Sequence, residues 1–275
     1  MIAAILVLYS PAYSRRSLAV LQRLLRRVDE EYRLVAVCNH AGLEVAPGPN
    51  LSVIQGHNSL GEFGAWDQGL AYLSGQPGCA SPRLFVFAND TFCHHRPFGL
   101  PEEWIFSRSF RQLAGMQRAI AGELSTFGEP FYLGGQRLDD WVSTYLYAMT
   151  PALLDALDWR IAPEDGVLER HVRGGLDERE FFAPELDAAL AAHLRGWLFG
   201  GRTQRVWRNA APLSQQNRDY MLRKARAILC EKLLSARCRS LGAGFLDPYA
   251  CFEGRAMRAA RGALGRLAGG AGMKA

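Results

Sequence analysis

The chain has 275 residues, enough for one large α/β core with a smaller appendage, because single hydrophobic cores stop growing near about 250 to 300 residues. Its hydrophobic content of 49% and charged content of 21% are typical of a soluble globular protein and exclude a disordered or membrane-spanning chain. The net charge of +5 is unevenly distributed. The stretch from Arg202 onward, with fifteen basic and four acidic residues, carries +11, and the rest carries −6.

The N-terminal run 2–9 is apolar, but it has no basic leader and no small-residue cleavage site, and Pro11 ends it. We therefore expect a buried strand here rather than a signal peptide or a membrane span. The six cysteines are scattered and form no CxxC pair. This spacing favours reduced thiols in a cytoplasmic protein over a zinc ribbon or a redox motif.

The first ninety residues alternate between strand and helix patterns. Continuous apolar or β-rich runs predict strands, and leucines at helical spacing predict helices. The predicted order is strand 3–9, helix 17–28, strands 33–38 and 51–54, helix 63–73 and strand 83–88. This order indicates a doubly wound, mostly parallel sheet flanked by helices, whose ligands bind beyond the carboxyl ends of the strands.

After Pro97 the pattern becomes helical over about 102–124. The β-branched and aromatic run 141–149 predicts another strand, and Pro151 is placed to begin a short helix. Further leucine stripes predict packing helices over about 183–199 and 215–241. A sheet of five to seven strands with a helical C-terminal appendage results.

The segment 58–95 carries the chemistry. A small-residue turn with Gly61 and Gly64 opens a helix, and an apolar strand then ends at Asp90. A diphosphate needs backbone donors or a helix N-terminus, together with a divalent cation held by one or two carboxylates. The layout therefore predicts a nucleotide site, with Asp90 as the metal ligand.

This segment resembles the inverting GT-A glycosyltransferases of the family 2 type. The positions that match the motif are Asn58, Gly61, the pair Gly69-Leu70, the strand RLFVFA and the pair Asn89-Asp90. More narrowly, GEFGAWDQGL followed by FANDTF is similar to glycosyltransferase-like proteins of O-antigen and rhamnan-type polysaccharide clusters, over about residues 1–160. The usual Asp-x-Asp reads Ala88-Asn89-Asp90 here, which leaves one carboxylate where two are expected.

The resemblance implies a GT-A-like Rossmann-type fold and a nucleoside-diphosphate sugar as donor. The residues implied to bind the donor are Asn58, Gly61, Glu62, Asn89, Asp90 and Arg96, with Mg²⁺ or Mn²⁺ at Asp90. Two alternatives stay open from the residues themselves. The pair Asn89-Asp90 also suits a turn that ends a strand, and Glu62 also suits the first turn of a helix.

An inverting transferase needs a general base that takes the proton from the acceptor hydroxyl. Asp140 precedes the predicted strand 141–149, and Glu164 and Asp165 lie in the following loop. The resemblance favours an acid beyond the fifth or sixth strand, which fits Glu164 or Asp165 slightly better. The three residues stay candidates for the catalytic base.

We divide the chain into a GT-A-like core at 1–160, acceptor-side and packing helices at 161–253, and a basic tail at 254–275. The tail interleaves arginines with Met257, Leu264 and Leu267, which is typical of an amphipathic helix on an anionic membrane. The predicted partners are a nucleoside-diphosphate sugar, a glycan or polyprenyl-linked acceptor and the inner face of the plasma membrane. Nucleic acid is not expected, since no aromatic platform or zinc pattern accompanies the charges.

Two other functions compete with hexosyl or deoxyhexosyl transfer. A sugar nucleotidyltransferase uses a similar sheet, but it carries a glycine-rich loop after the first strand, where this chain reads SPAYSRRS. A non-catalytic scaffold with the same fold would tolerate the single carboxylate. Burial of Asp90 would favour the scaffold.

Overall fold

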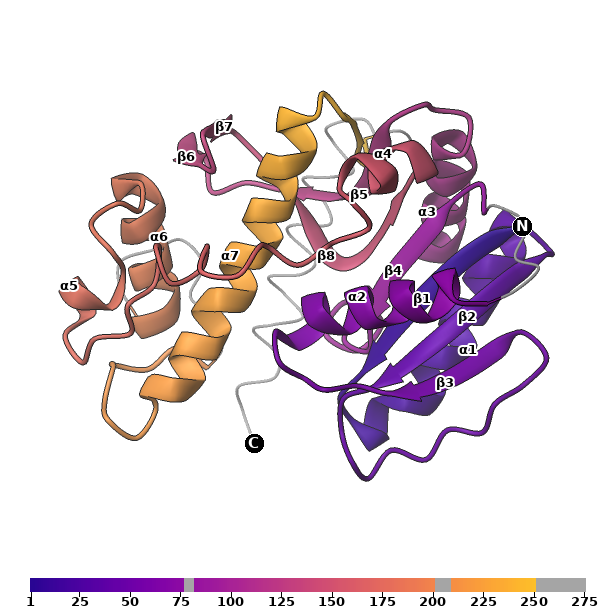
Figure 1. The fold of residues 1–275 in the computed structure, drawn as a ribbon, viewed down its shortest axis with the longest axis horizontal. Coiled ribbons are helices and arrows are strands. Elements are labelled where there is room, and N and C mark those ends of the chain that lie inside the picture. The colour runs from indigo at the N-terminus through magenta and orange to yellow at the C-terminus, as the bar shows by residue number, and fades with distance from the viewer. Residues whose placement is uncertain (77–81, 201–208, 251–275) are drawn as a thin grey trace.

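The computed structural model describes residues 1–76, 82–200 and 209–250. Across these residues, seven strands form one sheet in the order β3-β2-β1-β4-β8-β5-β9, and β6 and β7 form a separate hairpin (Figure 1). The strands of the sheet are β1 (Ile2–Leu8), β2 (Tyr32–Cys38), β3 (Leu51–Gln55), β4 (Phe85–Asn89), β5 (Ala119–Ser125), β8 (Trp141–Met149) and β9 (Gly244–Leu246). The hairpin pairs β6 (Phe131–Leu133) with β7 (Gln136–Leu138). The protein is thus α/β with a mostly parallel sheet, as the sequence predicts.

Helices flank this sheet on both faces. They are α1 (Pro11–Val28), α2 (Gly61–Ser74), α3 (Leu100–Leu113), α4 (Pro151–Ala156), α5 (Glu178–Phe181), α6 (Ala188–Phe199) and α7 (Arg218–Ser240). Helices α1 and α3 pack on one face in a core with β1, β2 and β4. Helices α2 and α7 pack on the other face, which is turned toward the viewer in Figure 1. The short α5 and α6 lie at the far side of α7 from β1–β3.

The strand order creates a switch point between β1 and β4. The chain runs outward from β1 to β2 and β3, all parallel, and then returns to β4 on the opposite side of β1. The strand order therefore reverses between β1 and β4, and ligands of open α/β sheets bind outside the carboxyl ends of the strands at such a point. Tyr9 and Asp90 lie at this point, because they directly follow β1 and β4.

The other half of the sheet contains one reversed strand. β8 runs antiparallel to both β4 and β5, and β9 lies parallel to β5 at the sheet edge. The β5–β8 pairing shifts register between Gly122 and Leu124, so that the start of β8 bends away from the regular ladder. Helix α7 covers this start, since the Ser235 hydroxyl accepts the Val142 N–H at 3.0 Å.

Close approach of α2 to the sheet depends on Gly69. A Cβ at this position would lie 2.5 Å from Cγ2 of Ile5 on β1, which is closer than atoms can pack. The missing side chain lets the large aromatic Trp66 reach the sheet, where its ring stands edge-on to Phe87 and Tyr147. Trp66 Nε1 also donates to the Ala88 carbonyl at 3.2 Å. These contacts fix α2 over β4.

Three predicted helices are wrong in extent. The helix expected over 17–28 begins earlier, at Pro11. The expected helix over 102–124 ends at Leu113, and residues 119–125 form strand β5. Alanine and leucine favour helix there, but tertiary packing prevails because Ala119–Ala121 are fully buried between β8 and β9. The helix expected from 183 begins at Ala188, after a bridge between Val172 and Phe182.

The remaining strands and helices of the core match their predictions within a few residues, and strand 141–149 matches at both ends. The hairpin β6–β7 and strand β9 were not predicted. The basic tail at 254–275 lies outside the described residues. Among the described helices, none combines the length and the apolar character needed to cross a lipid bilayer.

Candidate functional site

Asp90 joins the two strands of the switch point. Its Oδ2 accepts the backbone N–H of Tyr9 at 2.7 Å and that of Ser10 at 2.8 Å, while its own N–H donates to the Val7 carbonyl at 2.9 Å. The residue has no exposed surface. Because β1 and β4 are neighbouring parallel strands, a carboxylate after β4 reaches the N–H groups after β1. One carboxylate oxygen is thereby fixed.

The second oxygen of Asp90 has no such partner. Asp90 Oδ1, Tyr9 Oη and Asn39 Oδ1 are buried polar atoms without a hydrogen-bond partner in the described part of the chain. They follow β4, β1 and β2, three adjacent parallel strands, at their carboxyl ends. Buried polar atoms are nearly always paired, so three unpaired ones at a switch point indicate a place for a polar ligand.

Burial also governs the ionisation of these groups. Desolvation raises the pKa of Asp90, although the N–H groups of Tyr9 and Ser10 and the nearby His94 and His95 oppose the increase. The pKa of Tyr9 is raised strongly by burial and further by Glu62. The Asn39 side chain partly offsets the Tyr9 shift, although the two groups do not meet in hydrogen-bonding geometry. Tyr9 therefore keeps its proton and can donate it to a ligand.

The Asn89 side chain forms hydrogen bonds within its own turn. Its Oδ1 accepts the backbone N–H of Thr91 at 3.1 Å and the Thr91 hydroxyl at 2.6 Å. This arrangement is the strand-ending Asx turn that the sequence allowed as an alternative. The Ser17 hydroxyl of α1 then donates to the Asp90 carbonyl at 3.0 Å, which fixes the turn against the helix.

The turn before α2 lies beside Tyr9 and Asn39. Gly61 has a φ of +59°, and Asn58, which is exposed, has a φ of +52°. A Cβ at Gly61 would lie 3.4 Å from Tyr9 Oη, and Asn39 Nδ2 donates to the Gly61 carbonyl at 3.4 Å. The left-handed backbone favours a glycine here, and a Cβ would fill the space beside the Tyr9 hydroxyl without a clash.

Glu62 is half-buried in the first turn of α2. Burial raises its pKa, Glu231 and Asp90 raise it further, and Lys224 of α7 lowers it. Glu231 and Lys224 lie on α7, which packs on the same face of the sheet as α2, and Asp90 follows β4. Burial together with the two carboxylates favours the protonated form of Glu62.

The Arg96 side chain contacts strands β5 and β8. Its guanidinium forms an ion pair with Glu123 of β5 and lies 4.3 Å above the centroid of the Tyr145 ring. The Tyr145 hydroxyl donates to Glu123 Oε2 at 2.6 Å. The Arg96 side chain is 44% exposed, which leaves part of its guanidinium accessible to a ligand.

The two histidines after Asp90 pack on α1. The His94 ring stacks on Tyr13 with centroids 4.1 Å apart, and His95 stands edge-on to the same ring at 5.7 Å. Among the residues that the structure describes, no group of three or more His, Cys, Asp or Glu side chains could hold a metal ion. Asp90 therefore belongs to no such group.

The three predicted catalytic carboxylates are all at least partly exposed. Asp165 is 98% exposed and pairs with Arg160 at 3.0 Å, and Glu164 beside it is exposed. Asp140 is one-third exposed and forms an ion pair with Arg239 of α7. Because β8 is antiparallel to β4, its first residues, and Asp140 before them, lie toward the carboxyl end of β4.

A second polar cluster was missed by the sequence reasoning. Glu231 Oε1 accepts Trp141 Nε1 at 2.7 Å, and its Oε2 accepts the N–H and hydroxyl of Thr144 at 2.9 and 3.0 Å. Lys232 is 2% exposed, and its Nζ lies 3.7 Å from the Trp141 ring centroid. The signal was a Glu-Lys pair inside the otherwise apolar stripe of the predicted helix 215–241.

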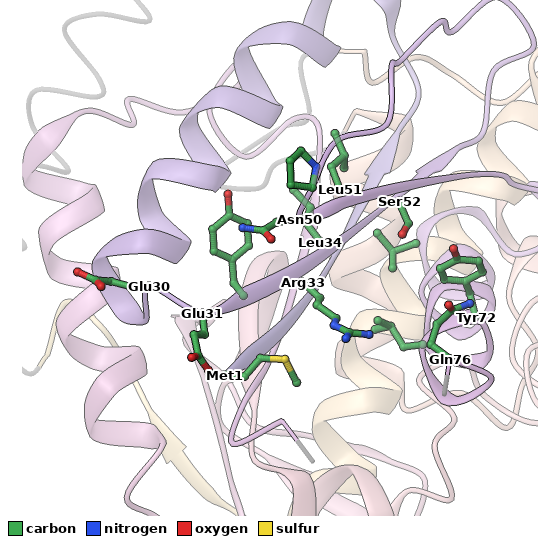
Figure 2. Close-up of a pocket in the computed structure, with 14 residues that line it drawn as sticks. Met1, Glu30, Glu31, Arg33, Leu34, Asn50, Leu51, Ser52, Tyr72 and Gln76 are labelled. Carbon is green, nitrogen blue, oxygen red and sulfur yellow. The ribbon is translucent and has the colours of Figure 1, made fainter. Parts of the chain in front are cut away.

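An open surface cavity lies at the opposite edge of the sheet. Figure 2 shows it lined by Glu31, Arg33, Asn50 and Ser52, with Gln76 beyond the end of α2. These residues lie at the amino ends of β2 and β3, whereas the unpaired atoms of Tyr9, Asn39 and Asp90 follow the carboxyl ends. The cavity is therefore separate from the switch-point site.

No protein-family model and no curated protein matches the chain. Among solved structures, the chain is similar to the mannosyltransferase PcManGT from Pyrobaculum calidifontis in complex with GDP-Man and Mn²⁺, with 12% identity, a TM-score of 0.38, and coverage of 95% of this chain and 79% of that one. It is also similar to residues 1–349 of TarS from S. aureus, with 13% identity, a TM-score of 0.34, and coverage of 92% and 73%.

Proposed function

We propose that this protein is a glycosyltransferase that takes its sugar from a nucleoside diphosphate at the switch point between β1 and β4. The observation that carries the proposal is the set of three buried, unpaired polar atoms after β1, β2 and β4: Tyr9 Oη, Asn39 Oδ1 and Asp90 Oδ1. Open α/β sheets bind nucleotides outside the carboxyl ends of their strands at a switch point. The sugar, the acceptor and the stereochemical course go beyond this observation.

Each unpaired atom suits one part of such a donor. Tyr9 Oη is a hydrogen-bond donor and Asn39 Oδ1 is an acceptor, so together they match the mixed polar edge of a nucleoside. The room that Gly61 leaves beside Tyr9 gives the nucleoside access. In this proposal Asn58 and Gly61 shape the nucleoside pocket, and Asp90, with Asn89 and Arg96 nearby, faces the diphosphate.

A divalent cation fits this arrangement only in company with the substrate. The protein supplies one free carboxylate oxygen, Asp90 Oδ1, and the described residues offer no set of three ligands. Mg²⁺ is commonly held by one or two carboxylates together with substrate phosphates. When bound, Mg²⁺ or Mn²⁺ would neutralise the charge that develops on the leaving diphosphate. Asp90 would hold the cation with one oxygen, since the other is bonded to Tyr9 and Ser10.

For the general base we propose Glu62. It is half-buried, it begins the helix that borders Tyr9, and burial together with Glu231 and Asp90 raises its pKa. A carboxylate with a raised pKa is a stronger proton acceptor for a sugar hydroxyl. The exposed Asp165, the neighbouring Glu164 and Asp140, which is paired with Arg239, are the alternatives.

The test is release of nucleoside diphosphate from a panel of UDP, GDP, dTDP and CDP sugars, with Mn²⁺ and an acceptor mixture of short glycans. The proposal expects turnover of one nucleotide class and at least a hundredfold loss of turnover in Asp90→Asn. Glu185→Gln, at a side chain that is 65% exposed, is the control and should retain full activity. Equal activity in Asp90→Asn and wild type would overturn the proposed site.

One observation favours a second function. Asp90 has no exposed surface, and the turn around it is satisfied by Tyr9, Ser10 and Ser17. A scaffold that keeps the fold without catalysis would bury this residue in the same way. Nucleotide binding with no turnover of any sugar in the panel would support the scaffold. Turnover lost in Asp90→Asn would exclude it.

A further inference from the structure

Helices α1 and α3 together present a strongly basic surface. Their arginines are Arg15, Arg16, Arg23, Arg26 and Arg27 on α1 and Arg108 and Arg111 on α3, and all seven are exposed. The only acids on the two helices are Glu102 and Glu103. Glu103 is buried, so it does not present its charge at the surface.

The two helices form one continuous surface. The Arg23 guanidinium donates to Glu103 at 2.6 Å, and Arg27 lies 3.6 Å from the same carboxylate. Arg111 also donates to the Arg27 carbonyl across the helix pair. Both helices cover the same face of the sheet. The arginines are therefore held side by side rather than spread around the molecule.

Large apolar side chains stand in this surface. Leu100 is 65% exposed and Trp104 is 49% exposed, one helical turn apart on α3. Arg108 continues the same stripe, with its guanidinium 5.5 Å from the Trp104 ring centroid. We call the seven arginines together with Leu100 and Trp104 the α1–α3 face.

The α1–α3 face adjoins the proposed site. Helix α1 begins two residues beyond β1, and α3 follows β4 and its turn, so both helices start at the carboxyl edge of the sheet. Arg15, Arg16, Leu100 and Trp104 lie in the first two turns of these helices. The exposed apolar and basic residues are thus nearest to the edge that carries Asp90.

We propose that the α1–α3 face docks the protein on an anionic lipid membrane. Clustered arginines are attracted to anionic headgroups, and a tryptophan and a leucine beside them can enter the boundary between headgroups and acyl chains. Tryptophan is the residue typical of that boundary. A nucleic acid would also attract the arginines, but it would gain nothing from an exposed leucine. The combination favours a membrane.

Docking in this way lays α1 and α3 on the bilayer and leaves the carboxyl edge of the sheet next to its surface. An acceptor carried on a lipid would then lie beside the switch-point site, and a water-soluble donor could still enter from solution. The face is distinct from the basic tail at 254–275, so docking does not depend on that segment. It also does not depend on sugar transfer, because vesicle binding is measured without a donor.

The test is co-sedimentation of the full chain with vesicles of equal parts phosphatidylglycerol and phosphatidylethanolamine, and with phosphatidylcholine vesicles. We expect binding to the anionic vesicles alone, and release as ionic strength rises. Arg15→Gln with Arg16→Gln should weaken binding about tenfold or more, since each basic residue near the surface contributes several-fold. Leu100→Ser with Trp104→Ser should weaken it by a similar factor.

Matched control variants test whether vesicle binding depends on this face or on net charge and exposed apolar side chains in general. Arg170→Gln with Arg179→Gln removes two exposed arginines elsewhere, and Tyr132→Ser with Leu176→Ser removes two apolar side chains of similar exposure. Both control variants should bind as wild type does. The membrane proposal is wrong if the α1–α3 variants bind anionic vesicles as the controls do. It is also wrong if no variant binds vesicles while the arginine variant loses binding to a duplex oligonucleotide. A circular dichroism melt for each variant confirms that it is folded.

Discussion

The carboxylate of Asp90 accepts the backbone N–H of Tyr9 at 2.7 Å, across 81 residues of sequence. This bond connects the ends of β1 and β4 and leaves Asp90 Oδ1 and Tyr9 Oη as buried atoms with no partner in the described residues. The proposed ligand site at Asp90 rests on these two unpaired atoms together with Asn39 Oδ1.

The turn before α2 offers a direct probe of the space beside Tyr9. An alanine at Gly61 would adopt a φ of +59° at a cost of about 1–2 kcal/mol, and its Cβ would lie 3.4 Å from Tyr9 Oη. We expect Gly61→Ala to lower the melting temperature and to weaken nucleotide binding at least tenfold. Calorimetric titration and a thermal melt measure the two effects.

Gly242 supplies the matched control. It has a φ of +67°, and a Cβ there would meet nothing within 4 Å. Gly242→Ala should lose similar stability and keep wild-type nucleotide binding. Equal loss of binding in both variants would mean that backbone strain, rather than the room beside Tyr9, is what matters.

Glu62 can be tested by its isosteric amide. In the proposed role, Glu62→Gln should lower kcat by about a hundredfold or more, with little change in donor affinity. The raised pKa of Glu62 also predicts that wild-type activity falls on acidification at a pH above the ordinary carboxyl value of 4.5. Steady-state rates across a pH series for wild type and Glu62→Gln check both expectations.

Three other carboxylates decide whether the assignment of the base is correct. Asp165→Asn, Glu164→Gln and Asp140→Asn should each retain more activity than Glu62→Gln. A large loss of kcat in one of them, with Glu62→Gln active, would transfer the base to that residue.

Lys232 makes stability depend on pH. Burial lowers its pKa from 10.5 to about 8, with Glu231 opposing and Lys224 reinforcing the shift. Above pH 8 the unfolded chain holds a proton that the folded protein has released, so the free energy of unfolding rises with pH. The buried Cys230 thiol, with its pKa raised from 9.0 to about 12, produces the opposite slope above pH 9.

The informative window is therefore pH 8 to 9. Between these values, wild type should gain about 1 kcal/mol relative to Lys232→Met, which has no titrating group at this site. Urea denaturation of both proteins at the two pH values provides the measurement. Parallel changes in the two proteins would show that Lys232 keeps its proton when buried.

Arg237 holds the loop after α4 against α7. Its guanidinium donates to four backbone carbonyls, those of Leu157, Arg160, Ile161 and Ala162, at 2.8 to 3.3 Å. A lysine cannot reproduce this fork, so Arg237→Lys should lower the free energy of unfolding by about 2–3 kcal/mol. Arg173→Lys, at an exposed pair with Glu185, should change it by less than about 0.5 kcal/mol. Similar effects in the two variants would contradict the account.

Much of the fold follows from local sequence patterns. Buried parallel strands are continuous apolar runs, which predicted the strand at 3–9. The strand at 141–149, which is antiparallel, was predicted from its β-branched and aromatic residues. The helix predicted over 102–124 is wrong at Ala119–Ala121, which lie in β5. Alanine has the highest helix propensity, and only the crowding between β8 and β9 makes its small side chain suitable for a central strand.

The site was predictable in part. Asp90 and Gly61 were identified because a turn, a helix and an acidic strand end follow one another along the chain. Tyr9 and Asn39 could not be found in this way, since they follow β1 and β2 and meet Asp90 only through the strand order. Glu231, which binds Trp141 across 90 residues, depends on how α7 crosses β8. Such contacts are set by tertiary packing alone.

The most direct test of the switch-point site is calorimetric titration of wild type, Asp90→Asn and Asn39→Ala with UDP, GDP, dTDP and CDP, each with and without Mn²⁺. We predict that wild type binds one nucleotide and that Mn²⁺ strengthens the binding. Asp90→Asn should bind the same nucleotide without the Mn²⁺ effect, and Asn39→Ala should bind it at least tenfold more weakly. Nucleotide binding that is unchanged in both variants, or no binding by the folded wild type, would contradict a nucleotide site between β1 and β4.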